Sequence, residues 1–179
     1  MFRDRRRRGP LSMILRRLFC VLAAVLAAAP AFAQEPRLQG NHRDWRVYTL
    51  GEGRERVCYA LSRPTDERPG NVAHGDIFFL ISSWASGAQR EQPTFVADFD
   101  LRPSSPPLAR VGSTRAPMYV SGREGFVENA SDERRLIQAM RRGSTMRVEA
   151  TSDRGTAVAY TFSLLGVTAA LNQVGELCG

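Results

Sequence analysis

Hydrophobic and polar side chains alternate along much of this chain, which is the pattern of β-strands with one buried face. The alternation is clearest at 44–49, 57–62, 146–150 and 158–164, and turn-forming residues separate the first two runs and the last two. Each of these pairs therefore predicts a β-hairpin. The run 76–81 is apolar without alternation, which predicts a strand covered on both faces.

Further short strands are expected at 95–100, 108–112, 117–120 and 125–128. One helix is well marked, since Ser131 can cap it, acidic residues follow, and Gly143 stands where a helix ends. Apolar spacing over 167–178 predicts a second helix. About eight strands with one or two short helices predict a mainly β fold, an antiparallel β-sandwich or barrel. We expect a single domain over 44–179, preceded by a flexible N-terminal arm at 34–43.

Charge is unevenly distributed along the chain. There are 25 basic and 18 acidic residues, and every basic residue is arginine. Seven of the arginines precede residue 34, so the remainder carries 18 basic against 17 acidic residues. The basic excess belongs to the N-terminus, and we expect no nucleic-acid partner. The lack of lysine excludes Schiff-base, Walker-type and Ser-x-x-Lys chemistry.

The N-terminus has the pattern of a secretory signal peptide over residues 1–33. Arg16 and Arg17 precede an apolar run at 18–29, and a small-x-small site ends at Ala33. The run is too short to span a bilayer, so we expect cleavage after Ala33 and a periplasmic protein without a transmembrane segment. Outer-membrane association and secretion stay open, as does twin-arginine export. Translation from Met13 would give a signal of more usual length.

Two cysteines, Cys58 and Cys178, remain after such cleavage. An even pair in an exported protein favours a disulfide, here between an early strand and the C-terminus. Free or intermolecular thiols are an alternative. A zinc site that combined the two cysteines with His42 and His74 is another, although no two of these residues have ligand-like spacing.

Candidate catalytic residues are few. His42 lies in the expected arm and His74 in a loop, and both are expected to be surface histidines. Asp98 and Asp100 are two residues apart on an expected strand, where they are paired carboxylates, calcium ligands or a solvated face. We expect no cofactor, no metal and no catalytic residue.

Four arginines on the expected helix form a candidate patch for anionic surfaces. They are Arg134, Arg135, Arg141 and Arg142. Arginine suits this role because its planar guanidinium binds phosphate and carboxylate groups through two hydrogen bonds. The alternative is favourable placement against the helix dipole together with solubility.

Several segments resemble the invasion-associated locus B family of bacterial exported proteins. They are Asp44-Trp45-Arg46-Val47-Tyr48, Val57-Cys58-Tyr59-Ala60, 75–80, and an ending over 140–171 that closes with Cys178. The resemblance covers about residues 44–178. It implies an immunoglobulin-like β-sandwich, export to the periplasm or envelope, and Cys58 and Cys178 as the family's matching cysteines. It supplies no catalytic residues.

These observations predict a non-enzymatic envelope protein that acts as a binding module, which the resemblance associates with host-cell invasion or envelope function. Strand edges or loops of a sandwich are the expected contact surfaces. The partner is an envelope protein, a host protein or an anionic surface, and the oligomeric state is open. A periplasmic enzyme, or an inhibitor or assembly factor, is the alternative.

Overall fold

The computed structural model describes residues 34–179, so the expected signal peptide and its cleavage site lie outside the described residues. The described chain is mainly β, with one antiparallel sheet of eleven strands and two α-helices. The strands are β1 (Arg37–His42), β2 (Trp45–Leu50), β3 (Val57–Ser62), β4 (Asp66–Arg68), β5 (Phe78–Trp84), β6 (Gln92–Val96), β7 (Leu108–Val111), β8 (Thr114–Ser121), β9 (Glu124–Val127), β10 (Thr145–Thr151) and β11 (Ala157–Ser163). The helices are α2 (Ala130–Arg142) and α3 (Val167–Cys178), with a 3-10 turn at Gly53–Glu55.

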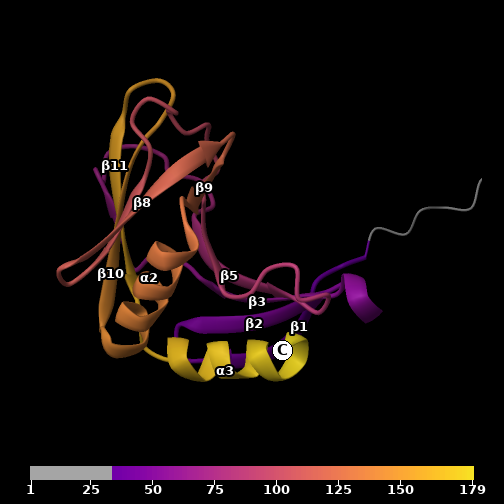
Figure 1. Cartoon of the computed structure of the whole chain (residues 1–179). Coiled ribbons are helices and arrows are strands. Elements are labelled where there is room, and N and C mark those ends of the chain that lie inside the picture. The colour runs from indigo at the N-terminus through magenta and orange to yellow at the C-terminus, as the bar shows by residue number, and fades with distance from the viewer. Residues whose placement is uncertain (1–33) are drawn as a thin grey trace, which may run out of the picture. The chain divides into compact units, whose positions relative to one another are not determined.

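The sheet folds back on itself at β8. Its strand order is β1-β2-β3-β5-β6-β9-β8-β7-β10-β11-β4. The later residues of β8, from Met118 to Ser121, pair with β9, whereas the earlier ones, from Thr114 to Pro117, pair with β7. β8 thus joins a first half, which contains β1, β2, β3, β5, β6 and β9, to a second half, which contains β7, β10, β11 and β4 (Figure 1).

Aromatic side chains fill the space between the two halves. Phe79 on β5 meets Phe162 on β11 edge to face, with ring centroids 5.8 Å apart. Phe95 on β6 lies 5.6 Å from the ring of Tyr160 on β11. The indole Nε1 of buried Trp45 donates to the carbonyl of a residue at the end of β11, at 2.9 Å. The expected mainly β, antiparallel, sandwich-like fold with short helices is therefore confirmed.

Both helices pack on the face of the sheet that carries its buried side chains, which we call the inner face. α3 contacts β1, β2, β3 and β5, whereas α2 contacts β6 to β9. α2 is capped by Asn129, whose side chain accepts from the amide of Asp132 at 3.0 Å, so the expected cap at Ser131 was wrong by two residues. The N-cap of α3 is Gly166, which has a positive φ of 94° and lies against the carbonyl of His42.

Three expectations about local structure were wrong. Residues 37–42 are not a flexible arm, because they form β1 and pair with β2 through a bulge. Residues 66–68, for which no strand was expected, form β4 and pair with β11. The apolar run 76–81 is not covered on both faces, because Phe79 and Ile81 are buried while Phe78 and Leu80 are half-exposed.

Within residues 34–179, none of the helices has the length and apolarity that crossing a membrane requires.

Candidate functional site

The four arginines predicted on α2 do not form a patch of free cations. Arg135 forms an ion pair with Asp132 one turn before it. Arg141 binds Glu91 at 2.6 Å and also donates to the side chain of Asn172 at 3.0 Å. Only Arg134 and Arg142 remain exposed without an ion pair to another described residue. The charge of this helix is therefore half neutralised by the fold itself.

His74 is buried, so the expectation of a surface histidine was wrong there. Its Nδ1 lies 2.9 Å from the hydroxyl of Tyr160 and its Nε2 lies 3.0 Å from the carbonyl of Pro69. Both ring nitrogens are thus used in holding a loop against β11. Burial, with a smaller contribution from Glu67, raises the pKa of Tyr160, so this phenol stays a neutral hydrogen-bonding group. His42 is half-buried, and its Nε2 lies 2.7 Å from the amide oxygen of Gln173.

Asp98 and Asp100 are not a strand-face pair, because they follow the end of β6. Both carboxylates face Arg123, at 3.2 Å and 3.7 Å. The guanidinium of Arg123 thus occupies the position that a metal cation shared by the carboxylates of Asp98 and Asp100 would take. Among residues 34–179 no group of three or more His, Cys, Asp or Glu side chains is arranged to hold a metal.

Cys58 and Cys178 form a disulfide, with Cα atoms 5.9 Å apart and 120 residues between them in sequence. Cys58 is fully buried on the inner face of β3, and Cys178 ends α3. The bond therefore ties the C-terminal helix to the inner face of the first half. The free-thiol and zinc alternatives are excluded for this pair.

The opposite, outer face of the first half is apolar, and no helix of the described chain covers it. In β3 the side chains of Val57, Tyr59 and Leu61 lie on the face away from buried Cys58 and Ala60. Cross-strand pairing continues this face over seven strands. We call it the apolar face, and its large side chains are Leu38, Tyr48, Leu50, Val57, Tyr59, Leu61, Phe78, Leu80, Trp84, Val96, Tyr119 and Phe126.

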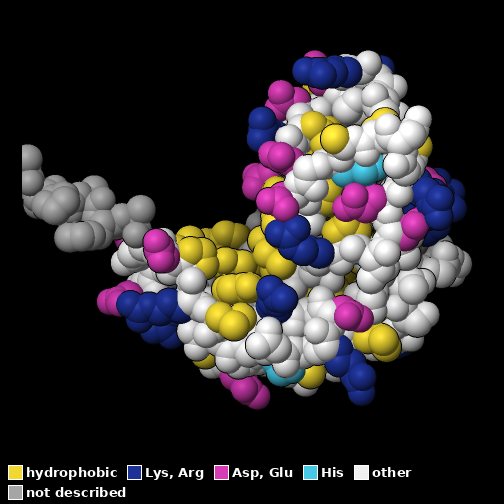
Figure 2. All heavy atoms as spheres, turned by 180° about the vertical axis from the view of Figure 1, so that it is seen from behind, with side chains coloured by type: hydrophobic (Ala, Val, Ile, Leu, Met, Phe, Trp, Pro, Cys, Tyr) yellow, Lys and Arg dark blue, Asp and Glu magenta, His cyan; other side chains and the backbone are white. Residues whose placement is uncertain are grey.

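Most of these side chains are partly shielded from solvent by their neighbours. Leu38 and Tyr119 are the more exposed ones, with 52% and 48% of their surface accessible. Viewed from behind, the described chain carries hydrophobic side chains gathered in a hollow, with charged side chains along its margin (Figure 2). The seven strands contribute four to seven residues each to this part of the sheet, so the face spans roughly 500 Å², polar positions such as Ser82 and Thr94 included. The largest apolar patch of a typical monomer covers a similar area, and such a patch is often an interaction site.

Aromatic stacking orders the apolar face. Tyr48 and Tyr59 stack across β2 and β3 with centroids 5.5 Å apart. Tyr119 and Phe126 stack across β8 and β9 at 5.4 Å. Burial, and next the neighbouring Tyr48, raises the pKa of Tyr59, so its hydroxyl stays protonated over the physiological range. The face thus offers ordered aromatic surface with neutral polar hydroxyls, which suits a protein interface.

At one margin of the apolar face, the guanidinium of Arg63 lies 4.5 Å from the ring centroid of Phe78 and binds Asp76 at 2.8 Å.

Sequence reasoning missed this face because it assigned the core from alternation alone. In β3 the larger alternating residues, such as Tyr59, are outward, while the small residues Cys58 and Ala60 accommodate α3. A signal was present nonetheless. An unbroken apolar run such as 76–81 is typical of a strand whose two faces are both covered. In this chain only one face of the strand is buried, so the other is available to a partner.

Comparison with known protein families identifies a match. The model of the Invasion associated locus B (IalB) protein family matches residues 45–175, from the first strand of the buried core to the last helix. Neither the curated proteins nor the solved structures contain a match. The matched region spans most of the sequence, so the resemblance expected from its motifs is confirmed: the chain belongs to the invasion associated locus B family.

Proposed function

We propose that this protein is a non-enzymatic binding module of the bacterial envelope and that it holds another protein on its apolar face. The observation that carries the proposal is the uncovered apolar face itself. Leaving aromatic and aliphatic side chains in contact with water opposes stability and solubility, and a partner removes that cost.

The composition and shape of the face favour a protein as the occupant. Tyr, Trp and Phe are enriched in the cores of protein interfaces. An area of roughly 500 Å² supplies much of the ~800 Å² per partner that a standard interface buries. The hollow shape in Figure 2 opposes direct insertion into a membrane, which requires a projecting apolar surface. The occupant is therefore a protein segment that projects into the hollow.

Chemistry of the described residues supports a role without catalysis. Both nitrogens of His74 are hydrogen-bonded within the fold, and both cysteines of the described chain are joined in the disulfide. Lysine is absent from the whole sequence. Few residues therefore remain that could form a catalytic nucleophile with a positioned general base.

Site-specific photocrosslinking in intact cells tests the proposal. A photoreactive residue replaces Ser82, which lies beside Tyr59 on the apolar face, and as a control it replaces Thr161, which lies outward on β11. We expect a discrete adduct from position 82 only, and we expect Tyr59→Glu to abolish it. The control variant Thr161→Glu places the same charge on the second half and should leave the adduct intact. Thermal unfolding followed by circular dichroism checks that each variant is folded.

Mass spectrometry of the adduct identifies the occupant. A heterologous envelope protein supports the proposal, whereas a dimer of this chain would make a second copy the occupant and overturn it. Equal labelling from the two positions, or persistence of the adduct in Tyr59→Glu, would also overturn it.

Localisation in the periplasm is part of the same proposal, supported by family membership and by the disulfide. The mass of the native protein from the periplasmic fraction should correspond to a chain that begins at Gln34. Retention of residues 1–33 in that protein would contradict export by a cleaved signal.

A further inference from the structure

Three arginines stand side by side on the outer face of the second half. The register pairs Arg110 on β7 directly with Arg115 on β8, and Arg147 on β10 directly with Arg110. Directly paired residues of antiparallel strands project from the same face. The buried neighbours Ala109, Ala116 and Val148 occupy the inner face, so these arginines point outward. We call them the arginine row.

Like charges directly opposite each other destabilise a sheet, so the arginine row is not explained by strand pairing. One carboxylate forms ion pairs with the arginine row: Glu149 binds Arg147 at 3.1 Å and lies 3.7 Å from Arg110. Arg115 is exposed and has no ion pair with another described residue. The Nε of Arg110 is buried without a hydrogen-bond partner in the described chain. The row therefore carries a net charge of about +2 and one unused buried donor.

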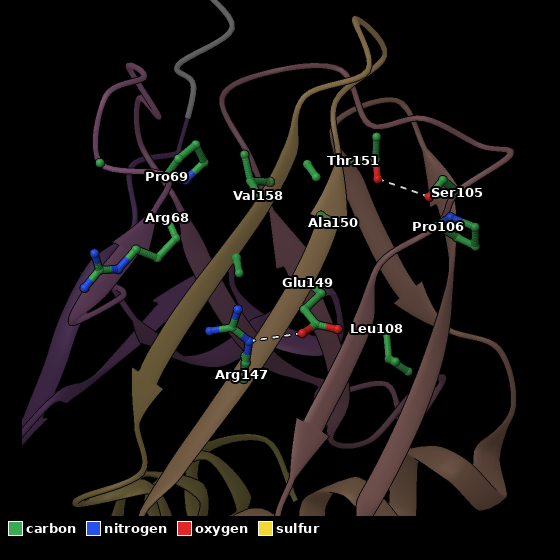
Figure 3. A pocket seen from close by; sticks show the side chains of 13 residues that line it. Arg68, Pro69, Ser105, Pro106, Leu108, Arg147, Glu149, Ala150, Thr151 and Val158 are labelled. Atoms are coloured by element: carbon green, nitrogen blue, oxygen red, sulfur yellow. Dashed lines mark hydrogen bonds and ion pairs between the residues drawn. The ribbon is translucent and has the colours of Figure 1, made fainter.

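A groove of about 760 Å³ adjoins the arginine row. Arg147 and Glu149 contribute to its lining, and the short side chains of Ala157 and Ala159 on β11 contribute as well. Pro69 lies on one side of the groove and Pro106 on the other, as the close view shows (Figure 3). The volume lies within the range of small-molecule sites. A ligand that places an anionic group on the row thus has room for its body beside it.

We infer that the arginine row binds a phosphomonoester group, with the body of the ligand in the adjoining groove. A phosphomonoester carries a charge of about −1.5 to −2 near neutral pH, which matches the row, whereas a single carboxylate leaves about half of the charge uncompensated. Its three terminal oxygens can accept hydrogen bonds from several guanidinium groups at once. A soluble sugar phosphate and a lipid headgroup share this chemistry.

Titration of the folded protein, followed by amide chemical shifts, tests the inference. The probes are inorganic phosphate, glucose 6-phosphate, acetate, and phosphatidylcholine vesicles that contain phosphatidic acid. We expect phosphate and glucose 6-phosphate to shift the amides of β7, β8 and β10, with glucose 6-phosphate binding more tightly. Arg115→Gln should weaken binding about tenfold, through the loss of charge-assisted hydrogen bonds. The control Arg134→Gln removes an equally exposed arginine from α2 and should leave the affinity unchanged.

The vesicles distinguish the two sources of the phosphate. Sedimentation of wild-type protein, but not of Arg115→Gln, with these vesicles assigns the site to a lipid headgroup, and binding of glucose 6-phosphate alone assigns it to a soluble ligand. Absence of phosphate binding, equal affinity for acetate, or equal weakening by Arg134→Gln would overturn the inference.

The test is independent of the proposed protein partner. Tyr59→Glu, on the apolar face, should leave phosphate binding unchanged, and Arg115→Gln should leave the photocrosslinked adduct unchanged. Either conclusion can therefore fail while the other stands.

Discussion

Removal of the Cys58–Cys178 bond should destabilise the protein by about 5 kcal/mol. The bond closes a loop of 120 residues, and in the chain-entropy model a loop of this length restricts the unfolded chain by about that amount. The bond also holds the end of α3, a helix at the chain terminus that has no side-chain N-cap. The perturbations are Cys58→Ser, Cys178→Ser and the double variant.

Urea unfolding followed by circular dichroism measures the effect. For a chain of this size, with an m-value of about 2 kcal/mol/M, a loss of 5 kcal/mol lowers the midpoint by about 2.5 M. Each single variant should lose about the same amount, and the double variant should lose little more, because either change removes the whole bond. Wild-type protein unfolded in the presence of a reductant is the matched control and should behave like the double variant. Additive losses in the double variant would refute the reasoning.

Three further predictions concern single residues and are measured by the same unfolding experiment. Gly166→Ala should cost about 3 kcal/mol or more, because the new Cβ would clash with the backbone carbonyl of His42. Gly53→Ala, also at positive φ but with nothing within 4 Å of its new Cβ, should cost about 1 kcal/mol, and equal costs would contradict the steric argument. Tyr160→Phe should cost about 1–3 kcal/mol at neutral pH, because it leaves a buried histidine nitrogen unpaired. Because the pKa of Tyr160 is raised in the folded protein, wild-type stability should fall as the pH rises above about 10, and the phenylalanine variant should show a smaller fall between pH 9 and 11; an unchanged pH dependence would argue against the raised pKa. Asn129→Ala should cost about 1 kcal/mol and Ser131→Ala less than half of that, and the reverse order would mean that the cap is misassigned.

The sequence predicted most of the strands and the disulfide, because these follow from local pattern and from the expected compartment. The hairpin of β10 and β11 follows from strict alternation around a turn, and it was found with nearly correct bounds. β1 was missed because it contains only one large apolar residue, Leu38, and is held by pairing with β2 and by α3. Such a strand exists through tertiary contacts, which local pattern does not contain.

Neither candidate surface was located from the sequence, and the reason is related in the two cases. The side chains of the arginine row come from three strands, and only the strand register brings Arg110, Arg115 and Arg147 together. The sequence pointed instead to the arginines of α2, because helix spacing can be read from the chain directly. In the same way, alternation in β3 identifies two faces but not which of them the C-terminal helix covers.

The contact between β1 and α3 has a consequence for the order of events when the chain is made. Gln173 on α3 donates to the carbonyl of Gln39 on β1 at 3.1 Å, so the earliest strand and the last helix depend on each other. A ribosome or a translocation channel releases the N-terminus first, and the inner face of β1, β2 and β3 then has no cover until the final residues emerge. The first half of the sheet can therefore close only after α3 has been released. A chain of this topology completes the core of its first half and its disulfide late in folding.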